Sequence, residues 1–292
     1  MYPDFLVIGA QKAGTTWLHR NLQAHPEIWM PQNEVHYFDR KIKESGTFDE
    51  RWYASLFEEG QGKTVGDCTP AYSIVGKEMV AYVHELMPDA KIIFLMRSPI
   101  ERAWSQAVMR VVKKEGSVEN LTEEQLLSRV SREKSQLRTN YLRTLENWGT
   151  YYSEDRIFIG FLEDISFMPE SLLTGVHEFL GIDPSFRPPA LNKRINSRSS
   201  DTMPTSVATH LAHTYHGSMR RLSELFGGYA SFWLYSAEWL IEAPPEGQAI
   251  TYPLWDSSLR ENWSGGLEDP SAVFSREAKL QSGPLSAIQV PR

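Results

Sequence analysis

Residues 3–18 read PDFLVIGAQKAGTTWL, an apolar run that passes through a short glycine-containing loop into a helix-like pattern. This order predicts a strand, a phosphate loop and a helix. Gly9 and Gly14 allow the backbone to curl so that successive N–H groups point inward, and the following helix directs the positive end of its dipole to the same place. The loop is therefore expected to bind an anion.

The loop differs from the nucleotide-hydrolase pattern G-x-x-x-x-G-K-[ST] in the position of its lysine. Gly9 and Gly14 have the required spacing, but Thr15 stands where that pattern has Lys, and Lys12 lies inside the loop. Lys12 would therefore lie beside an anion shorter than a triphosphate. The spacing favours a 5′-phosphate that carries one terminal group. The alternative is a glycine turn that serves packing alone.

A second strand end carries a related signal. The apolar run KIIFLM at 91–96 is followed by RSPIERAWS at 97–105. Arg97 and Ser105 could meet one phosphate, the guanidinium as a bidentate donor and the hydroxyl as a further donor. Pro99 suits the first turn of a helix, with Ser98 as its N-cap. Taken singly, Arg97 is better explained as a surface ion pair and Ser105 as a solvated helix position.

Together the two stretches resemble the sulfotransferases that use 3′-phosphoadenosine 5′-phosphosulfate (PAPS), in particular the branch of the heparan sulfate N- and O-sulfotransferases and their bacterial relatives. The resemblance implies that the first loop binds the 5′-phosphosulfate and the second the 3′-phosphate, which stays on the product, 3′,5′-adenosine bisphosphate (PAP). It covers about residues 3–240 and also implies a loop over the nucleotide that holds Lys193, Arg194 or Arg198. The implied donor-binding residues are Lys12, Ala13, Gly14, Thr15, Thr16, Trp17, Arg97 and Ser105.

The segment NEVHYFD at 33–39 resembles the acidic segment in which these enzymes keep their catalytic base. Sulfuryl transfer to an alcohol or amine requires the acceptor to lose a proton as its bond to sulfur forms, and Glu34 is predicted to take that proton. Lys12 is predicted to stabilise the charge on the leaving bisphosphate oxygen. His36 is a further catalytic candidate, with a packed or substrate-lining histidine as the alternative. No metal is expected, because the donor has no β,γ-phosphate pair for magnesium to bridge.

The third stretch that matches, GDCTPAY at 66–72, also departs from the family. Heparan-type members commonly carry an active-site Lys where this chain has Cys68. The missing cation argues against a heparan-like polyanion as the acceptor. Cys68 itself is predicted to be a small apolar filler, with a reactive thiol as the alternative.

Short apolar runs alternate with helical periodicity, which predicts an α/β fold. The runs are Phe5–Ile8, the vicinity of Val65, Ile92–Met96 and Ile157–Phe161, and they predict one P-loop-like domain with a mostly parallel sheet flanked by helices. Residues 1–242 are predicted to form this sulfotransferase domain. Residues 243–292 lose the periodicity and are predicted to form a C-terminal extension that packs on the domain or covers the cleft. The histidines at 210, 213 and 216 drift around a helix and predict no metal site.

The amino-acid composition argues against some classes of binding partner. The 292 residues carry a formal net charge of −7, which argues against nucleic acids or anionic membranes as partners. A small-molecule, glycolipid or saccharide acceptor fits better, with sulfation of a hydroxyl favoured over an amine. One cysteine excludes an internal disulfide, and the N-terminus shows no leader, so we expect a cytoplasmic protein without stable membrane insertion, typical of a bacterial relative. The oligomeric state is open.

Two other classes of protein fit parts of the pattern. A P-loop nucleotide kinase or hydrolase would bind ATP with magnesium and use Asp67 as its metal-holding residue, but the position of Lys12 argues against it. A non-catalytic nucleotide-binding protein of the same fold would bind the donor without turnover. Against this second alternative stands the complete set of Lys12, Glu34, Arg97 and Ser105.

Overall fold

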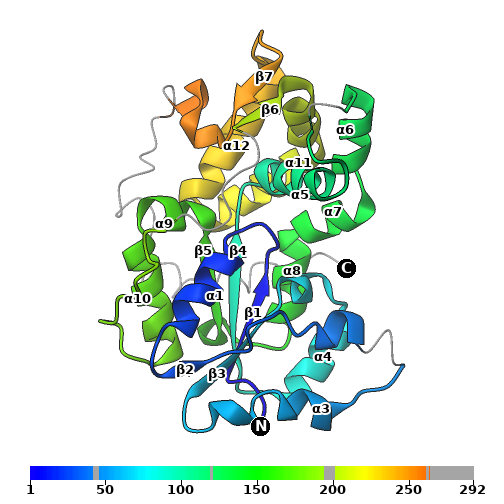
Figure 1. Cartoon of the computed structure of the whole chain (residues 1–292). Helices are drawn as coiled ribbons and strands as arrows, with labels where there is room; N and C mark the ends of the chain where they lie inside the picture. Colours follow the sequence, from blue (N-terminus) through cyan, green and yellow to red (C-terminus); the bar gives the residue numbers. More distant parts are fainter. Residues whose placement is uncertain (42–45, 119–120, 194–200, 261–262, 264–292) are drawn as a thin grey trace. The chain divides into compact units, whose positions relative to one another are not determined.

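The computed structural model describes residues 1–41, 46–118, 121–193, 201–260 and 263. The chain divides into two units. The first comprises Met1–Met96 and Arg143–Ile195, and the second comprises Arg97–Leu142 and Asn196–Arg292. The first unit holds the large sheet, whereas the described part of the second unit is mainly helical (Figure 1).

The sheet of the first unit has five parallel strands in the order β2-β3-β1-β4-β5. This confirms the predicted α/β class, and each predicted apolar run is a strand. The short edge strand β2 was not predicted, since its two residues give no periodicity. The strands are β1 (Phe5–Gly9), β2 (Ile28–Trp29), β3 (Thr64–Cys68), β4 (Lys91–Met96) and β5 (Ile157–Phe161).

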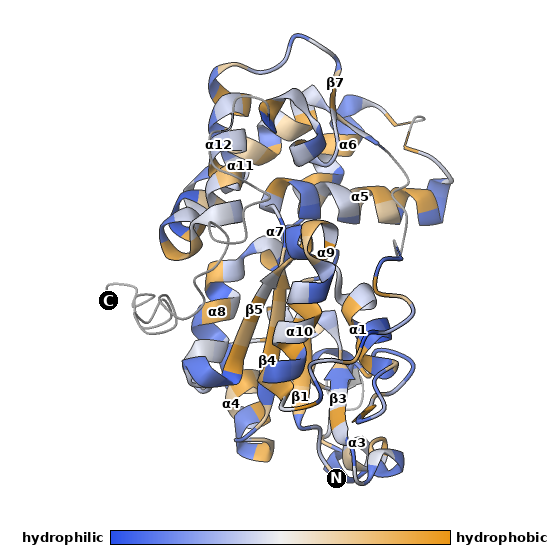
Figure 2. Cartoon of the chain, turned by 90° about the vertical axis from the view of Figure 1, so that its left-hand side faces the viewer, coloured by the Kyte–Doolittle hydropathy of each residue, from blue (hydrophilic) through white to orange (hydrophobic). Residues whose placement is uncertain are grey.

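Helices cover both faces of this sheet. Figures 1 and 2 place α1 and α10 on one face and α4 and α8 on the other, as right-handed crossovers between parallel strands require. The central strands are hydrophobic along most of their length (Figure 2), because both of their faces are buried. The helices of this unit are α1 (Thr15–Gln23), α3 (Glu50–Ser55), α4 (Lys77–Leu86), α8 (Tyr141–Gly149, which begins in the second unit), α9 (Leu162–Phe167) and α10 (Pro169–Leu180).

Strand β1 lies at the point where the strand order reverses. The chain leaves β1 toward β2 and β3 on one side and returns through β4 on the other. In open parallel sheets, ligands bind outside the carboxyl ends of the strands at this reversal. Val7 of β1 lies in register with Cys68 of β3, so the loop after β1 and the residues after β3 emerge at the same edge.

The second unit is built from helices and one small antiparallel strand pair. Its elements are α5 (Pro99–Glu115), α6 (Glu123–Val130), α7 (Glu133–Thr139), α11 (Thr205–Phe226), α12 (Gly228–Glu242), β6 (Thr202–Pro204) and β7 (Ala249–Thr251). None of the helices described in either unit is long and apolar enough to cross a membrane.

The described part of the predicted C-terminal extension packs within this second unit. Strand β7 pairs with β6, and the backbone N–H of Leu254 donates to Glu101 Oε1 at 2.8 Å. Residues 261–262 and 264–292 lie outside the described residues. The boundary at residue 242 therefore stays a prediction.

Two of the three histidines on α11 have different partners, and the third, His213, is exposed. His210 Nε2 lies 2.8 Å from the hydroxyl of Ser131, and His216 Nε2 lies 3.5 Å from Glu238 Oε1. Within the part of the chain that the structure describes, no group of three or more His, Cys, Asp and Glu side chains is arranged to hold a metal ion.

Candidate active site

The loop after β1 has the backbone geometry of an anion-binding turn. Lys12 and Gly14 adopt left-handed conformations, with φ of 74° and 94°, and Gly14 occupies the N-cap position of α1. No side chain caps this helix, and its first turn contains no acidic residue. The N-terminal amides of α1 and the positive end of its dipole therefore fit an anion bound at this turn.

Gly14 is required here for two reasons. A side chain would be strained at its positive φ, and a Cβ would lie 2.3 Å from Cδ1 of Ile165 on α9. The loop is therefore packed against α9 at the point where it turns into α1.

The remaining predicted donor-binding residues of this loop differ in exposure. Ala13 and Thr15 are buried, and Thr16 is exposed. The indole N–H of Trp17 donates to the carbonyl of Leu191 at 2.9 Å, so this buried side chain supports the segment after α10. Lys193 is described and exposed, whereas Arg194 and Arg198 lie outside the described residues.

A Glu–His–Asp relay occupies the predicted base segment. His36 Nε2 lies 2.8 Å from Glu34 Oε2, and His36 Nδ1 lies 2.9 Å from Asp39 Oδ1. Glu34 is half exposed at 49%, whereas the side chains of His36 and Asp39 are 17% and 12% exposed. Asp39 was not singled out from the sequence, although its position three residues after His36 was a usable signal.

Each ring nitrogen of His36 faces one carboxylate. An ionised carboxylate only accepts hydrogen bonds, so Nδ1–H of His36 donates to Asp39 and thereby fixes the orientation of the ring. On the other side of the ring, Glu34 Oε2 lies 2.8 Å from His36 Nε2, within hydrogen-bond distance. His36 thus bridges the carboxylates of Glu34 and Asp39 and holds both in a fixed arrangement.

His36 reaches this position through a rarely populated backbone conformation. Its φ is 57°, in the left-handed region. For a residue with a Cβ this conformation costs on the order of 1 kcal/mol, so the surrounding contacts must hold it. Such outliers are common at functional sites.

Cys68 contacts the first residue of the helix that follows the anion loop. Its thiol is buried and lies 3.9 Å from the carbonyl oxygen of Thr15 in α1. Burial raises the pKa of this thiol well above its usual value, and the negative charges of Asp67 and Glu34 raise it further. Glu34 thus lies within electrostatic range of the residue that contacts the start of α1. A buried and protonated thiol agrees with the predicted filler role.

The predicted 3′-phosphate residues lie at the start of α5 in the second unit. Arg97 is buried and donates from Nε and Nη2 to Glu101 Oε2 at 3.1 and 3.0 Å, and it also bonds to the hydroxyl of Tyr252. Arg97 thus forms an ion pair with Glu101 that is buried, unlike the surface ion pair considered from the sequence. Ser105 is half-buried two turns into the same helix.

Ser98 occupies the N-cap position of this helix, as predicted, but its side chain does not cap it. Helix α5 begins at Pro99 as expected, but the Ser98 side chain makes no capping hydrogen bond. Its hydroxyl is buried and has no hydrogen-bond partner among the described residues. A buried hydroxyl left unsatisfied at a helix N-terminus fits an external acceptor such as a phosphate oxygen.

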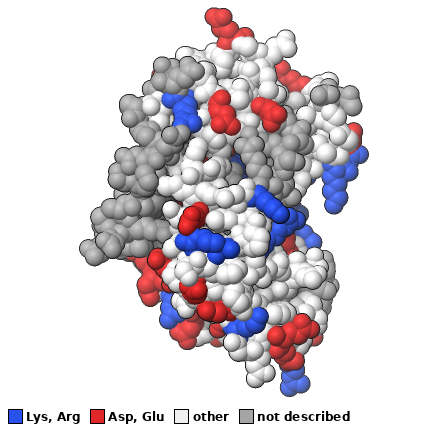
Figure 3. All heavy atoms as spheres, turned by 60° about the vertical axis from the view of Figure 1, so that its left-hand side comes forward, with Lys and Arg blue, Asp and Glu red and all other residues white. Residues whose placement is uncertain are grey.

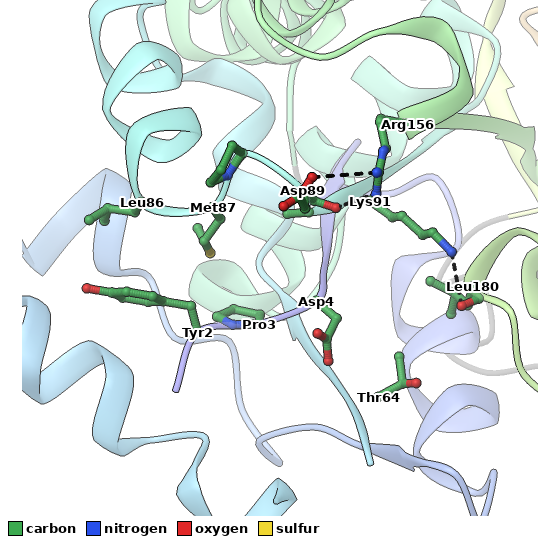
Figure 4. A pocket seen from close by; sticks show the side chains of 12 residues that line it. Tyr2, Pro3, Asp4, Thr64, Leu86, Met87, Asp89, Lys91, Arg156 and Leu180 are labelled. Atoms are coloured by element: carbon green, nitrogen blue, oxygen red, sulfur yellow. Dashed lines mark hydrogen bonds and ion pairs between the residues drawn. The ribbon is translucent and has the colours of Figure 1, made fainter. Parts of the chain in front are cut away.

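A further pocket lies at the opposite edge of the first unit's sheet. It has a volume of about 440 Å³ and is formed around the amino-terminal ends of β1, β3 and β4 (Figure 4). Its cations have partners within the protein, because Lys91 Nζ donates to the carbonyl of Leu180 and Arg156 Nη1 to that of Asp89. We therefore do not assign it to the site.

Figure 3 shows where charged side chains lie on one side of each unit. The Lys and Arg side chains shown there form small groups separated by acidic and uncharged residues.

Comparison with known proteins shows the family. Residues 2–223 match the sulfotransferase domain, and the chain belongs to this family. It is 30% identical over 185 residues to human heparan sulfate glucosamine 3-O-sulfotransferase 6, covering 62% of this chain and 53% of that protein. It is 26% identical over 203 residues to human bifunctional heparan sulfate N-deacetylase/N-sulfotransferase 2, covering 62% of this chain and 22% of that protein. The predicted resemblance to the heparan sulfate branch is thereby confirmed.

The fold has a solved counterpart. The crystal structure of a sulfotransferase from Alicyclobacillus acidocaldarius superposes with a TM-score of 0.62 at 22% identity, covering 77% of this chain and 96% of that one. At this identity the likeness supports the fold. The chain spans about half of the length of the human 3-O-sulfotransferase that it matches.

Proposed function

We propose that this protein transfers a sulfuryl group from PAPS to a hydroxyl, or less readily an amine, of a small-molecule, glycolipid or saccharide acceptor. The observation that carries the proposal is the Glu34–His36–Asp39 relay at the carboxyl-terminal edge of the sheet. Family membership supports the reaction type. The uncapped start of α1 supports an anionic donor.

Each residue has one role in the proposed reaction. Glu34 accepts the proton of the acceptor hydroxyl while the oxygen of that hydroxyl bonds to sulfur. His36 and Asp39 orient and stabilise the carboxylate of Glu34. The bond between sulfur and the bridging oxygen of the donor breaks, and PAP leaves with the electron pair. Lys12 neutralises the charge that develops on this oxygen. A positioned base and fixed charges suffice for this chemistry.

The remaining donor contacts are assigned from the sequence. The backbone and hydroxyls of residues 13–17 bind the 5′-phosphosulfate, and Arg97 and Ser105 bind the 3′-phosphate. The unsatisfied hydroxyl of Ser98 supports a phosphate at the start of α5. Arg97 would approach that phosphate with its guanidinium already oriented by Glu101.

The charge around Glu34 bears on the acceptor. Three acidic residues belong to this region, namely Glu34, Asp39 and Asp67. Cys68, which ends β3 and contacts the start of α1, adds no positive charge. A polysulfated acceptor would be repelled here, so a neutral or weakly charged acceptor is favoured. Such products belong to natural-product or glycoconjugate biosynthesis, and we place the enzyme in the cytoplasm.

Ligand-dependent stabilisation tests the donor assignment. The shift in melting temperature is measured with PAP, 5′-AMP, ADP, and ATP with magnesium, each at about a hundred times a plausible Kd, where binding adds about 2.7 kcal/mol. PAP is expected to stabilise most. Turnover is then followed as PAP released from PAPS with p-nitrophenol or octyl β-D-glucopyranoside as the acceptor.

Two matched variants test whether turnover depends on the loop after β1. Lys12→Ala should lower turnover at least tenfold, whereas Lys63→Ala, an exposed lysine before β3, should not. Stabilisation by ATP with magnesium alone would overturn the proposal in favour of a kinase or hydrolase. Stabilisation by PAP without any release from PAPS across a wide acceptor panel would favour the non-catalytic alternative.

A further inference from the structure

Three consecutive backbone N–H groups of the base segment are bound by two buried hydroxyls. Those of Val35 and His36 donate to Thr69 Oγ1 at 3.1 and 3.4 Å, and that of Tyr37 donates to the hydroxyl of Tyr72 at 3.0 Å. The segment includes the left-handed residue His36 and belongs to no strand or α-helix up to Tyr37. These bonds therefore hold the backbone that carries Glu34 and His36.

Both hydroxyls donate to one carboxylate. Thr69 Oγ1 lies 2.7 Å from Asp67 Oδ1, and the hydroxyl of Tyr72 lies 2.9 Å from Asp67 Oδ2. A hydroxyl has one proton and two lone pairs. Because each proton points to Asp67, the lone pairs of both hydroxyls face the N–H groups of the base segment. The carboxylate thus fixes the direction of the whole network.

Asp67 is an unusual residue for this position. It is fully buried at the end of β3, and its partners Thr69, Tyr72 and Tyr53 are buried as well. Burial raises the pKa of Asp67 to about 6, although hydrogen bonds from the three hydroxyls and the charge of His36 oppose the rise. Burying a carboxylate costs free energy that an apolar side chain would not. A role in ordering the neighbouring hydroxyls accounts for its presence.

We propose that Asp67 is a positioning residue, which acts through Thr69 and Tyr72 to hold Glu34 and His36 in the geometry needed for proton transfer. The effect on turnover rests on the proposed sulfuryl transfer. The effect on the backbone of residues 35–37 does not, and it can be measured independently.

The chain offers variants that separate positioning from general stability. Thr69→Val keeps the shape of the side chain but removes the hydroxyl that binds Val35 and His36, and Thr69→Ser restores it. Asp67→Asn introduces a donor where the network needs an acceptor. Tyr53→Phe is the matched control, because the Tyr53 hydroxyl donates to Asp67 Oδ2 at 3.1 Å but has no bond to residues 34–37 among those described.

Two measurements are made on each variant. Amide hydrogen exchange at residues 35–37 reports the anchoring of the segment, and PAP release from PAPS with p-nitrophenol or octyl β-D-glucopyranoside reports kcat and KM. We expect Thr69→Val to speed exchange at these amides at least tenfold and to lower kcat about tenfold to a hundredfold, with KM for PAPS within twofold. Asp67→Asn should act in the same direction. Thr69→Ser should recover most of both properties, and Tyr53→Phe should match the parent.

The outcomes separate this proposal from the function itself. Unchanged exchange at residues 35–37 in Thr69→Val overturns it even if Asp67→Asn does not fold. Faster exchange with an unchanged kcat also overturns it, since the anchoring would then not serve catalysis. An equal fall of kcat in Tyr53→Phe and Thr69→Val would also overturn it, because the hydrogen-bond network would then serve the stability of the fold and not the position of the base segment. If the parent releases no PAP, the proposed function fails, whereas the exchange data still decide whether Asp67 anchors the segment.

Discussion

Nδ1 of His36 lies 2.9 Å from Oδ1 of Asp39, three residues later in the chain. The second oxygen of Asp39 lies 3.2 Å from the same nitrogen, so the carboxylate faces the ring with both oxygens. This contact leaves Nε2 of His36 directed at Glu34. Glu34 is thus connected to Asp39 through the ring of His36.

Replacing Asp39 by Asn tests this coupling. The amide keeps the shape of the side chain but removes the charge that orients and stabilises the imidazole, as in other carboxylate–histidine pairs. We expect kcat for PAP release to fall at least tenfold, with PAP binding within twofold of the parent by calorimetry. Arg40→Gln is the control, since Arg40 is exposed and lies 3.8 Å from Asp39. An Asp39→Asn enzyme with the parent kcat would show that the relay is structural.

Glu34→Gln removes the proposed base with little change in shape. Transfer should be abolished, because an amide cannot take the proton of the acceptor, while the affinity for PAP stays near that of the parent. Both are measured on the same preparation, by PAP release and by calorimetry. The exposed Glu58→Gln serves as the control. Parent-like turnover would exclude Glu34 as the base, and His36 would be the next residue to test.

The sequence was sufficient for four of the five strands of the sheet and for the glycine turn after β1. Long apolar runs and glycine spacing are local signals. The structure confirms the strands that the runs predicted, and it shows Gly14 in a left-handed conformation in the turn where the backbone was expected to curl. The parts that were missed depend on contacts between distant residues. Asp67 binds the base segment through Thr69 and Tyr72, more than 30 residues beyond it. Nothing in residues 33–39 alone shows which hydroxyls receive their N–H groups.

The start of α5 shows the same limit. The sequence places Pro99 in the first turn and offers Ser98 as a cap, but the hydroxyl makes no such bond. The buried partners of Arg97 include Tyr252, far along the chain, which local spacing does not reveal. The type and position of Arg97 therefore predicted that it binds a phosphate, but they did not predict its ion pair with Glu101.

Ser105→Ala tests the assignment of the 3′-phosphate. The loss of a hydrogen bond to a charged group should weaken PAP binding about tenfold and leave 5′-AMP binding unchanged, because only PAP has the 3′-phosphate. Arg97→Ala should also weaken PAP binding, but it leaves Glu101 buried without its partner and is expected to lower stability as well. Lys114→Ala, at the exposed far end of α5, is the control. Equal affinities of the parent for PAP and 5′-AMP would contradict the assignment.

The raised pKa of Asp67 predicts a stability effect with a definite sign. The folded chain binds a proton at this group near pH 6, whereas the unfolded chain does so near 3.8. The stability that this group contributes is therefore complete below about pH 3.8 and is lost as the pH rises through 6. The difference amounts to about 3 kcal/mol. Urea unfolding at pH 7.5 and 4.5 should show a gain on acidification for the parent relative to Asp67→Asn. A parallel change in both proteins would contradict the shifted pKa.

His177 on α10 predicts the opposite dependence. Its ring is fully buried, lies 4.7 Å from that of His25, and has no hydrogen-bond partner on either nitrogen among the described residues. Burial lowers the pKa of His177 to about 4, and the charges of His25 and Arg187 lower it further. The stability that a neutral His177 contributes is present above pH 6.5 and is lost as the pH falls through 4, by at most about 3 kcal/mol.

Replacing His177 by Phe should remove this acid sensitivity, since an aromatic ring of similar shape cannot take up a proton in the unfolded chain. The free energy of unfolding between pH 7.5 and 4.5 should fall less in His177→Phe than in the parent, as measured by urea unfolding. His213→Gln, on the exposed face of α11, should leave the difference as in the parent. If His177→Phe and the parent lose the same stability over this interval, the histidine is protonated within the fold, and its ring must have a polar partner there.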